Sequence, residues 1–251
     1  MSSEKFVEKM KNIQSILLEF LEDESDADDK YENFVDLVST HKIINDHYEF
    51  KALLQLTSII GNDYHRIPNF ISKVERVLRH FKQDLQKYFS NSEIFQIFKV
   101  NKRMLLFLLE EKMMIIDEYI FSIITSSEYV EKNYCEYFQP EIKPFVTEEN
   151  IEKYGSKNKS LKDPEFIERM NKEVESDFYE KRREGANDDS LCELIRNNEI
   201  IEFIKFTEQI NLSLEIEIKK SIFETNQLLT YDSTISLIEY ASFYGSNDII
   251  K

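Results

Sequence analysis

Side chains that could bind a metal or act as a nucleophile are few and widely spaced in this 251-residue chain. The histidines are His41, His47, His65 and His80, and no His-Glu-x-x-His pair occurs. The cysteines Cys135 and Cys192 are too far apart for a Cys-x-x-Cys site. No Gly-x-Ser-x-Gly motif or glycine-rich phosphate loop is present. We therefore expect no catalytic residue, no metal and no cofactor.

An acidic run, EDESDADD, covers residues 22–29. A calcium-binding EF-hand loop needs a glycine at its sixth position and a distal glutamate, and this run contains no glycine. We interpret the run as a solvated linker.

Positive charge is concentrated in residues 66–103, which contain nine Lys or Arg and three acidic residues. On a helix, Lys73, Arg76, His80 and Lys87 would share roughly one face. Two readings stay open. The face is either solvated and neutralised by the acidic remainder, or it is a docking patch for an acidic peptide or for this protein's own acidic segments.

The whole chain carries a net charge of −16, which would repel both nucleic acid and an anionic membrane surface. No apolar run approaches the ~20 residues that a membrane span requires. The polar start, MSSEKFVEKMK, does not resemble a secretory signal. We expect a cytoplasmic protein with two free thiols, a protein partner, no nucleic-acid partner and no membrane insertion.

The composition indicates an all-α fold. Hydrophobic residues make up 41% of the chain, enough for a core, while Gly and Pro number only four each. Sheet proteins need turn residues often, so scarce Gly and Pro favour helices joined by short loops. Apolar spacing predicts helices from Phe6 to Leu21 and near residues 30–40, 46–60, 68–89, 91–98, 101–109, 117–125, 127–138 and 163–184.

Boundary residues refine these helices. Asp46 and Asn101 are expected to cap helix starts, Asn91 or Ser92 to cap the helix between them, and Gly61 to end a helix. Residues 139–162 read as a linker with one helical turn near Thr147. We divide the chain into a helical N-terminal domain, 1–145, a linker and long helix, 146–187, and a C-terminal part, 188–251.

The C-terminal part contains a repeated helix–turn–helix pattern. In the first unit, SLCELIR and EIIEFIKFTEQ flank a turn at Asn197-Asn198, and asparagine tolerates the left-handed conformation that such a turn needs. The second unit turns at Gly245. A unit seen twice is typical of a solenoid. We expect Phe203, Ile204, Phe206, Ile238 and Ala241 to be mostly core. The repeat-core positions of the two units are Leu191, Leu194, Phe203, Ile238, Ala241, Gly245 and Ile249.

Residues 237–250, LIEYASFYGSNDII, resemble the core of an ankyrin repeat. Ile238 matches the motif's first-helix leucine, Ala241 and Ser242 its small pair, Gly245 its turn glycine, and 249–250 its second apolar pair. The Thr-Pro dipeptide of the motif is absent. The segment from residues 182–185 through 190–192 and 222–226 to Gly245 looks like the large ankyrin-repeat families of parasitic protists such as trichomonads, which carry an uncharacterised helical N-terminal domain. The resemblance implies an array truncated inside a second helix.

The segment between the two units is longer than an ankyrin repeat of about 33 residues allows. Within 210–235 the apolar residues Leu212, Leu214, Ile216 and Ile218 alternate, which suits a short strand or hairpin, or an extended arm, as well as a helix.

These features favour a non-catalytic protein–protein interaction scaffold of ankyrin-repeat type. The alternative is a small-molecule binder or enzyme that uses a pocket in the N-terminal helical domain. A nucleic-acid binder using residues 66–103 is a third hypothesis, against which the net charge argues. At the C-terminal end, we expect Ile249 and Ile250, beside three aromatic residues, to form an apolar patch that allows self-association.

Overall fold

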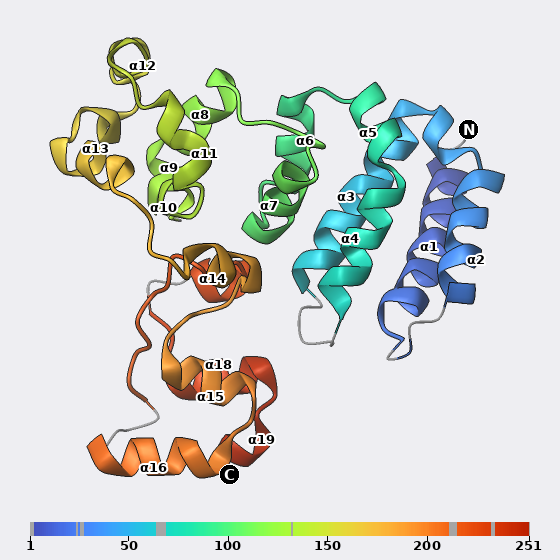
Figure 1. Ribbon diagram of the computed structural model, residues 1–251. Coiled ribbons are helices and arrows are strands. Elements are labelled where there is room, and N and C mark those ends of the chain that lie inside the picture. Colours follow the sequence, from blue (N-terminus) through green and yellow to red (C-terminus); the bar gives the residue numbers. More distant parts are fainter. Residues whose placement is uncertain are drawn as a thin grey trace. The chain divides into compact units, whose positions relative to one another are not determined.

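The protein is all-α, as the composition predicts (Figure 1). The structure, a computed structural model, describes residues 3–23, 25, 28–63, 69–131, 133–210, 215–231 and 234–250. These ranges contain nineteen α-helices, three short 3₁₀ helices and no strand. No helix among them is long and apolar enough to cross a membrane.

Contacts divide the chain into two compact units, residues 1–115 and 116–251. The sequence predicts the first boundary after residue 145. The division falls earlier because residues 116–145 bond to later segments. The Asn158 side chain donates to the Ser122 carbonyl at 2.7 Å, and the Tyr137 hydroxyl donates to the Arg182 carbonyl at 2.7 Å.

The first unit is built from helices that pack through aromatic residues. Its elements are α1 (Ser3–Leu21), α2 (Asp28–Thr40), η1 (Ile43–Asn45), α3 (His47–Asp63), α4 (Phe70–His80), α5 (Lys82–Tyr88), α6 (Asn91–Phe98) and α7 (Lys102–Glu110). Figure 1 shows α1 beside α2 and α3 beside α4, and these pairs are in contact. Phe34, Phe50 and Phe81 form edge-on ring contacts in the core.

Capping residues account for several helix starts. Asp46 accepts hydrogen bonds from the backbone amides of Tyr48 and Glu49, and Asn101 accepts one from Met104, as predicted. The cap of α6 is Ser90, which forms a capping box with Glu93, so the prediction of Asn91 or Ser92 was wrong by one or two positions.

The prediction that Gly61 ends a helix was wrong, because α3 continues to Asp63. Its lack of a side chain serves packing instead: a Cβ atom there would lie 2.8 Å from the Met104 Cε. The predicted helix 68–89 is divided at Phe81 into α4 and α5. Its apolar residues at helical spacing are buried: Phe70, Val74, Val77, Phe81, Leu85 and Phe89. Pro68, the expected first residue, lies outside the described ranges.

The second unit begins with short helices, and they also occupy residues 139–162, where a linker with one helical turn was predicted. They are α8 (Glu118–Ile124), α9 (Ser127–Glu131), α10 (Tyr134–Tyr137), α11 (Gln139–Ile142), η2 (Lys143–Phe145), α12 (Glu148–Tyr154), η3 (Lys159–Lys162), α13 (Pro164–Asn171) and α14 (Phe178–Glu184). Asp163 caps α13 and Gly185 ends α14 at φ 72°, but the long helix expected between them is interrupted after Asn171.

Two helix pairs follow, as the sequence predicts. They consist of α15 (Ser190–Arg196) with α16 (Ile200–Ile210), and α18 (Leu237–Tyr244) with α19 (Asn247–Ile250). The turns contain Asn198 at φ 54° and Gly245 at φ 67°, both left-handed. The second pair packs on the first, α18 against α15 and α19 against α16.

We call residues 215–231, which lie between the two helix pairs, the strap. The strap contains α17 (Gln227–Tyr231), and its Glu217 forms an isolated antiparallel bridge with Ser236, the residue before α18. The strand or hairpin considered for this region is thus a single bridge in its described part. Residues 211–214, which include Leu212 and Leu214, lie outside the described ranges.

Candidate functional site

The basic residues of α4 and α5 are largely engaged within the first unit. Lys73 is only 4% exposed, and its Nζ donates to the carbonyl of Phe20 at 3.1 Å and to those of Asp23 and Ser25. A helix leaves carbonyls unpaired at its C-terminal end, where a cation is stabilising. Lys73 therefore caps α1 and is not available to a partner.

Arg76 binds the acidic segment that follows α1. Its Nη2 lies 2.7 Å from the Asp28 Oδ1, and its guanidinium stands 3.9 Å from the centre of the Tyr31 ring. This pair fits both readings of the region, a solvated face neutralised by acidic residues and a patch for the protein's own acidic segments.

Arg79, Lys82 and Gln86 bind the two residues that follow α7. The Arg79 Nη2 lies 2.8 Å from a Glu111 carboxylate oxygen, and Lys82 donates to the Glu111 carbonyl. The Gln86 amide donates to the Lys112 carbonyl at 2.7 Å. The hydrogen bond from Arg79 holds the pKa of Glu111 below its ordinary value.

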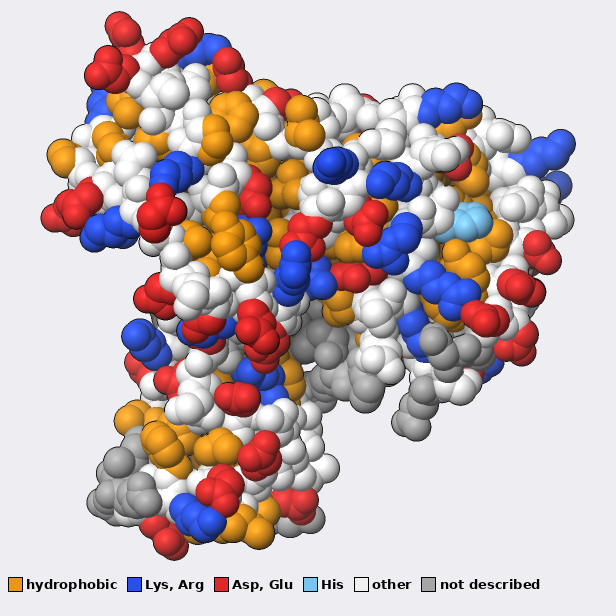
Figure 2. Space-filling model, viewed as in Figure 1, with side chains coloured by type: hydrophobic (Ala, Val, Ile, Leu, Met, Phe, Trp, Pro, Cys, Tyr) orange, Lys and Arg blue, Asp and Glu red, His pale blue; other side chains and the backbone are white. Residues whose placement is uncertain are grey.

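The other two residues of the expected patch, His80 and Lys87, are exposed. His80 lies edge-on to Tyr31, and Lys87 donates to the Tyr88 hydroxyl at 3.1 Å, which raises the pKa of Lys87. Figure 2 shows blue and red side chains interspersed on the visible face of this region. The four residues named from the sequence thus do not form one exposed basic face.

The repeat-core residues lie mostly where the sequence placed them. Phe203, Ala241 and Ile249 are buried, and Leu191 and Leu194 pack partly buried against them. Ile238 is 38% exposed, and Leu237 takes its place in the core at 1%. Leu237 lies one helical turn before Tyr240 and Ala241, so the inward face of α18 starts one residue earlier than predicted.

Two further core predictions on α16 were wrong. Ile204 is 45% exposed and Phe206 is 36% exposed, whereas Phe203 is 4% exposed. A short helix buries one stripe, and consecutive residues 100° apart cannot all share it.

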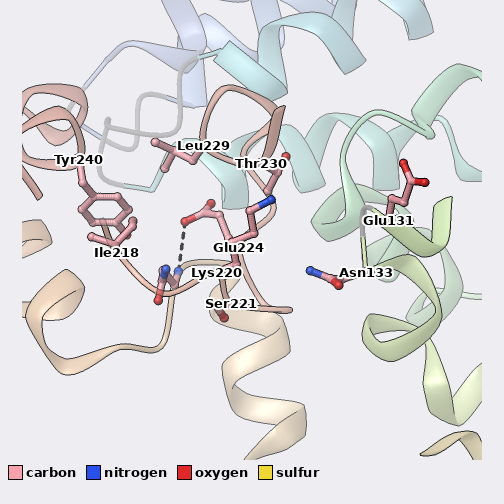
Figure 3. A pocket seen from close by; sticks show the side chains of 10 residues that line it. Glu131, Asn133, Ile218, Lys220, Ser221, Glu224, Leu229, Thr230 and Tyr240 are labelled. Atoms are coloured by element: carbon pink, nitrogen blue, oxygen red, sulfur yellow. Dashed lines mark hydrogen bonds between the residues drawn. The ribbon is translucent and has the colours of Figure 1, made fainter. Parts of the chain in front are cut away.

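A buried polar cluster ties the strap to the turn between α14 and α15 (Figure 3). Glu224, 4% exposed, accepts hydrogen bonds from the backbone amides of Asn187 at 3.2 Å and Asn226 at 2.9 Å. The Asn187 side chain donates to the Lys219 carbonyl at 2.8 Å. Both the hydroxyl and the amide of Thr225 donate to the Gly185 carbonyl.

The cluster continues into the helix pairs. Arg196 donates to the Asn187 carbonyl, to the Tyr240 hydroxyl at 3.1 Å and to Glu184 at 2.8 Å. Burial raises the pKa of Tyr240, so its hydroxyl stays protonated. Sequence reasoning missed this cluster because its members stand apart in the chain and form no motif.

Two hollows border the cluster. A groove of about 540 Å³ lies between residues 187–190 and 219–223, within the size range of small-molecule sites. A recess of about 30 Å³ beside Glu224 is drawn in Figure 3. Its lining residues are Glu131, Asn133, Asn187, Ile218, Lys220, Ser221, Glu224, Leu229, Thr230 and Tyr240.

A second buried charge joins the earlier helices of this unit. Arg182, 2% exposed, binds Glu141 with two nitrogens at 2.6 and 2.9 Å and donates to the Tyr137 carbonyl at 3.1 Å. This bidentate pair connects α14 to α10 and α11. The sequence shows only adjacent arginines at a helix end, which does not reveal which one is buried.

Both cysteines are buried free thiols. Burial raises the pKa of Cys192 to about 12 and that of Cys135 as well. A thiol that stays protonated is a poor nucleophile, so neither cysteine is a reactive site as placed here.

Comparison of the chain with protein-family models, with curated proteins and with solved structures found no match.

Proposed function

We propose that this protein is a non-catalytic protein–protein interaction scaffold whose C-terminal helix pairs form the start of an ankyrin-type array. Support comes from the repeated geometry: two helix pairs, each with a left-handed turn residue, stack in the same order. In such an array the buried faces hold neighbouring units together, and the exposed residues are free to contact a partner.

The observation that carries the proposal is the exposed apolar side of α16. Ile201 is 67% exposed and Ile204 is 45% exposed, one helical turn apart. Single exposed apolar residues are ordinary, but neighbouring ones on one helix favour a contact surface. The pair of Glu202 with Lys205, 2.6 Å apart, lies beside them and supplies the polar rim that interfaces commonly have.

The second helix pair offers a smaller apolar surface for self-association. Ile238 and Ile250 are 38% and 36% exposed, but Tyr240 and Ile249 are buried in the core. The surface we propose at this end is therefore Ile238 with Ile250, which is smaller than the patch expected from the sequence.

A protein partner agrees better with the charges than nucleic acid does. Lys73, Arg76 and Arg79, from the most basic part of the chain, are engaged by this protein's own carbonyl and carboxylate groups. The net charge of −16 then opposes binding to a polyanion. We place the protein in the cytoplasm, in agreement with its two free cysteines.

Paired substitutions on α16 test the proposal. The full chain carrying I201E and I204E should lose the protein partners that the wild type retains when both are used as bait in extracts of its native cell. The control is I59E, which places a glutamate at a 58% exposed isoleucine of α3. Circular dichroism should show equal helix content in all three proteins. Partners retained equally by I201E/I204E and I59E would contradict the proposal.

A further inference from the structure

We propose that the strap carries an open edge through which two copies of this chain pair, antiparallel and about a twofold axis at Ile218. One side of the strap is already paired with the residues before α18. The Ile218 amide donates to the Ile235 carbonyl at 2.7 Å, and the Leu237 amide donates to the Ile216 carbonyl at 3.0 Å. These two bonds lie on either side of the bridge at Glu217.

The other side of the strap is open. In an antiparallel pair whose bonds flank a residue, the amide and carbonyl of that residue point away from the paired strand. Both groups of Glu217 therefore point outward, and neither has a hydrogen-bond partner among the described contacts. Glu217 is also exposed. An extended backbone with unpaired groups along one edge is a template for pairing with another strand.

Lys219 extends the same edge. The chain has no turn or bend from residue 217 to 221, and alternate residues of an extended strand share an edge. The Lys219 carbonyl accepts the Asn187 side-chain amide at 2.8 Å and can accept a second hydrogen bond. Its amide has no partner among the described contacts.

The segment paired with the strap does not offer a second open edge. The Ser236 amide donates to the Glu239 carboxylate at 2.8 Å, and the Ser236 carbonyl accepts the Tyr240 amide at 3.0 Å. The start of α18 thus uses these groups, and pairing with another chain is confined to the strap.

The open edge is complementary to itself, which identifies a second copy as the strand that pairs with it. With the twofold axis at Ile218, Glu217 lies opposite the partner's Lys219, and Lys219 opposite the partner's Glu217. Opposite charges in a cross-strand pair are stabilising, whereas like charges are destabilising. An axis at Glu217 would place two glutamates opposite each other, so the axis at Ile218 is favoured.

Charge reversal in the full chain tests this pairing. Sedimentation equilibrium of the wild type should show a dimer that forms as the concentration rises. E217K or K219E alone should weaken the dimer by about tenfold, because both cross-strand pairs then carry like charges. E217K/K219E restores opposite charges in both pairs and should recover the wild-type dimer. Circular dichroism should show equal helix content in all four proteins.

This dimer is independent of the surfaces proposed on α16 and α18. I201E/I204E and I238E should therefore leave it unchanged, so the two proposals can fail separately. A wild type that stays monomeric at every concentration, single reversals that dimerise like the wild type, or a double variant that does not recover would overturn the inference. A dimer lost in I201E/I204E or in I238E would also overturn it.

Discussion

At the scale of single residues, buried charges are the most consequential feature of this protein. Lys73 and Arg182 are each nearly inaccessible, and each uses its charge to bind groups from a distant part of the chain. A surface charge pair contributes little to stability, whereas removing one partner of a buried charge leaves the other without compensation.

We expect K73M to destabilise the first unit by about 1.5–3 kcal/mol, because hydrogen bonds from a charged donor to the carbonyls that end α1 are lost. K87M is the matched control, since Lys87 lies exposed on α5 and its substitution should change stability by less than about 0.5 kcal/mol. Urea unfolding of both variants measures the difference. Equal stability of K73M and K87M would show that Lys73 does not cap α1.

R182M should cost about 3–5 kcal/mol, because it leaves the Glu141 carboxylate without its bidentate partner. The adjacent Arg183 is exposed, so R183M should have a much smaller effect. A double-mutant cycle with E141Q, followed by chemical unfolding, measures the coupling between Arg182 and Glu141. Additive effects of R182M and E141Q would mean that the two side chains do not interact in solution.

At the scale of helices, local chemistry predicts starts better than ends. The side chains of Asp46, Asn101 and Asp163 identify helix starts from the sequence because a cap bonds to amides two or three residues away. The role of Gly61 depends on Met104, which lies on another helix, and no local pattern reveals that contact.

The difference between local and long-range contacts also explains which parts of the candidate site the sequence predicts and which it does not. The repeated apolar spacing predicted both helix pairs and their turns. The ankyrin resemblance aligned Ile238 with a buried leucine of the motif, whereas the structure buries Leu237. The polar cluster joining Asn187 to Glu224 depends on how the strap folds back, and neither residue stands in a recognisable motif.

The register of α18 gives a direct comparison of two neighbours. L237A should cost about 2–5 kcal/mol because it opens a cavity in the core, whereas I238A removes a partly exposed side chain and should cost less than about 1 kcal/mol. Thermal unfolding of both variants checks this. A larger loss of stability in I238A than in L237A would show that Ile238 is the buried residue, as the sequence predicts.

A second comparison tests the inward face of α16. F203A should cost about 3–5 kcal/mol, since the Phe203 ring is 4% exposed. F206A should cost clearly less, because the Phe206 ring is 36% exposed. The two free energies of unfolding can be read from denaturant titrations on the full chain. Similar values would mean that α16 rotates relative to its position here.

At the scale of the whole molecule, two compact helical units share one chain, and the second contains both the short helices of its first half and the helix pairs. Arg182 and the cluster around Glu224 connect these parts of the second unit through hydrogen bonds. These hydrogen bonds join the helix pairs to the short helices that precede them.

Site-specific photocrosslinking of the full chain in its native cell tests the central claim that α16 presents a contact surface for a protein. A photoreactive amino acid replaces Ile201 in one protein and Ile59, an isoleucine of α3 that is also more than half exposed, in the other. Our account predicts that position 201 yields a discrete crosslinked protein that position 59 does not yield. The same products from both positions, or none from position 201 while the protein is folded and expressed, would contradict it.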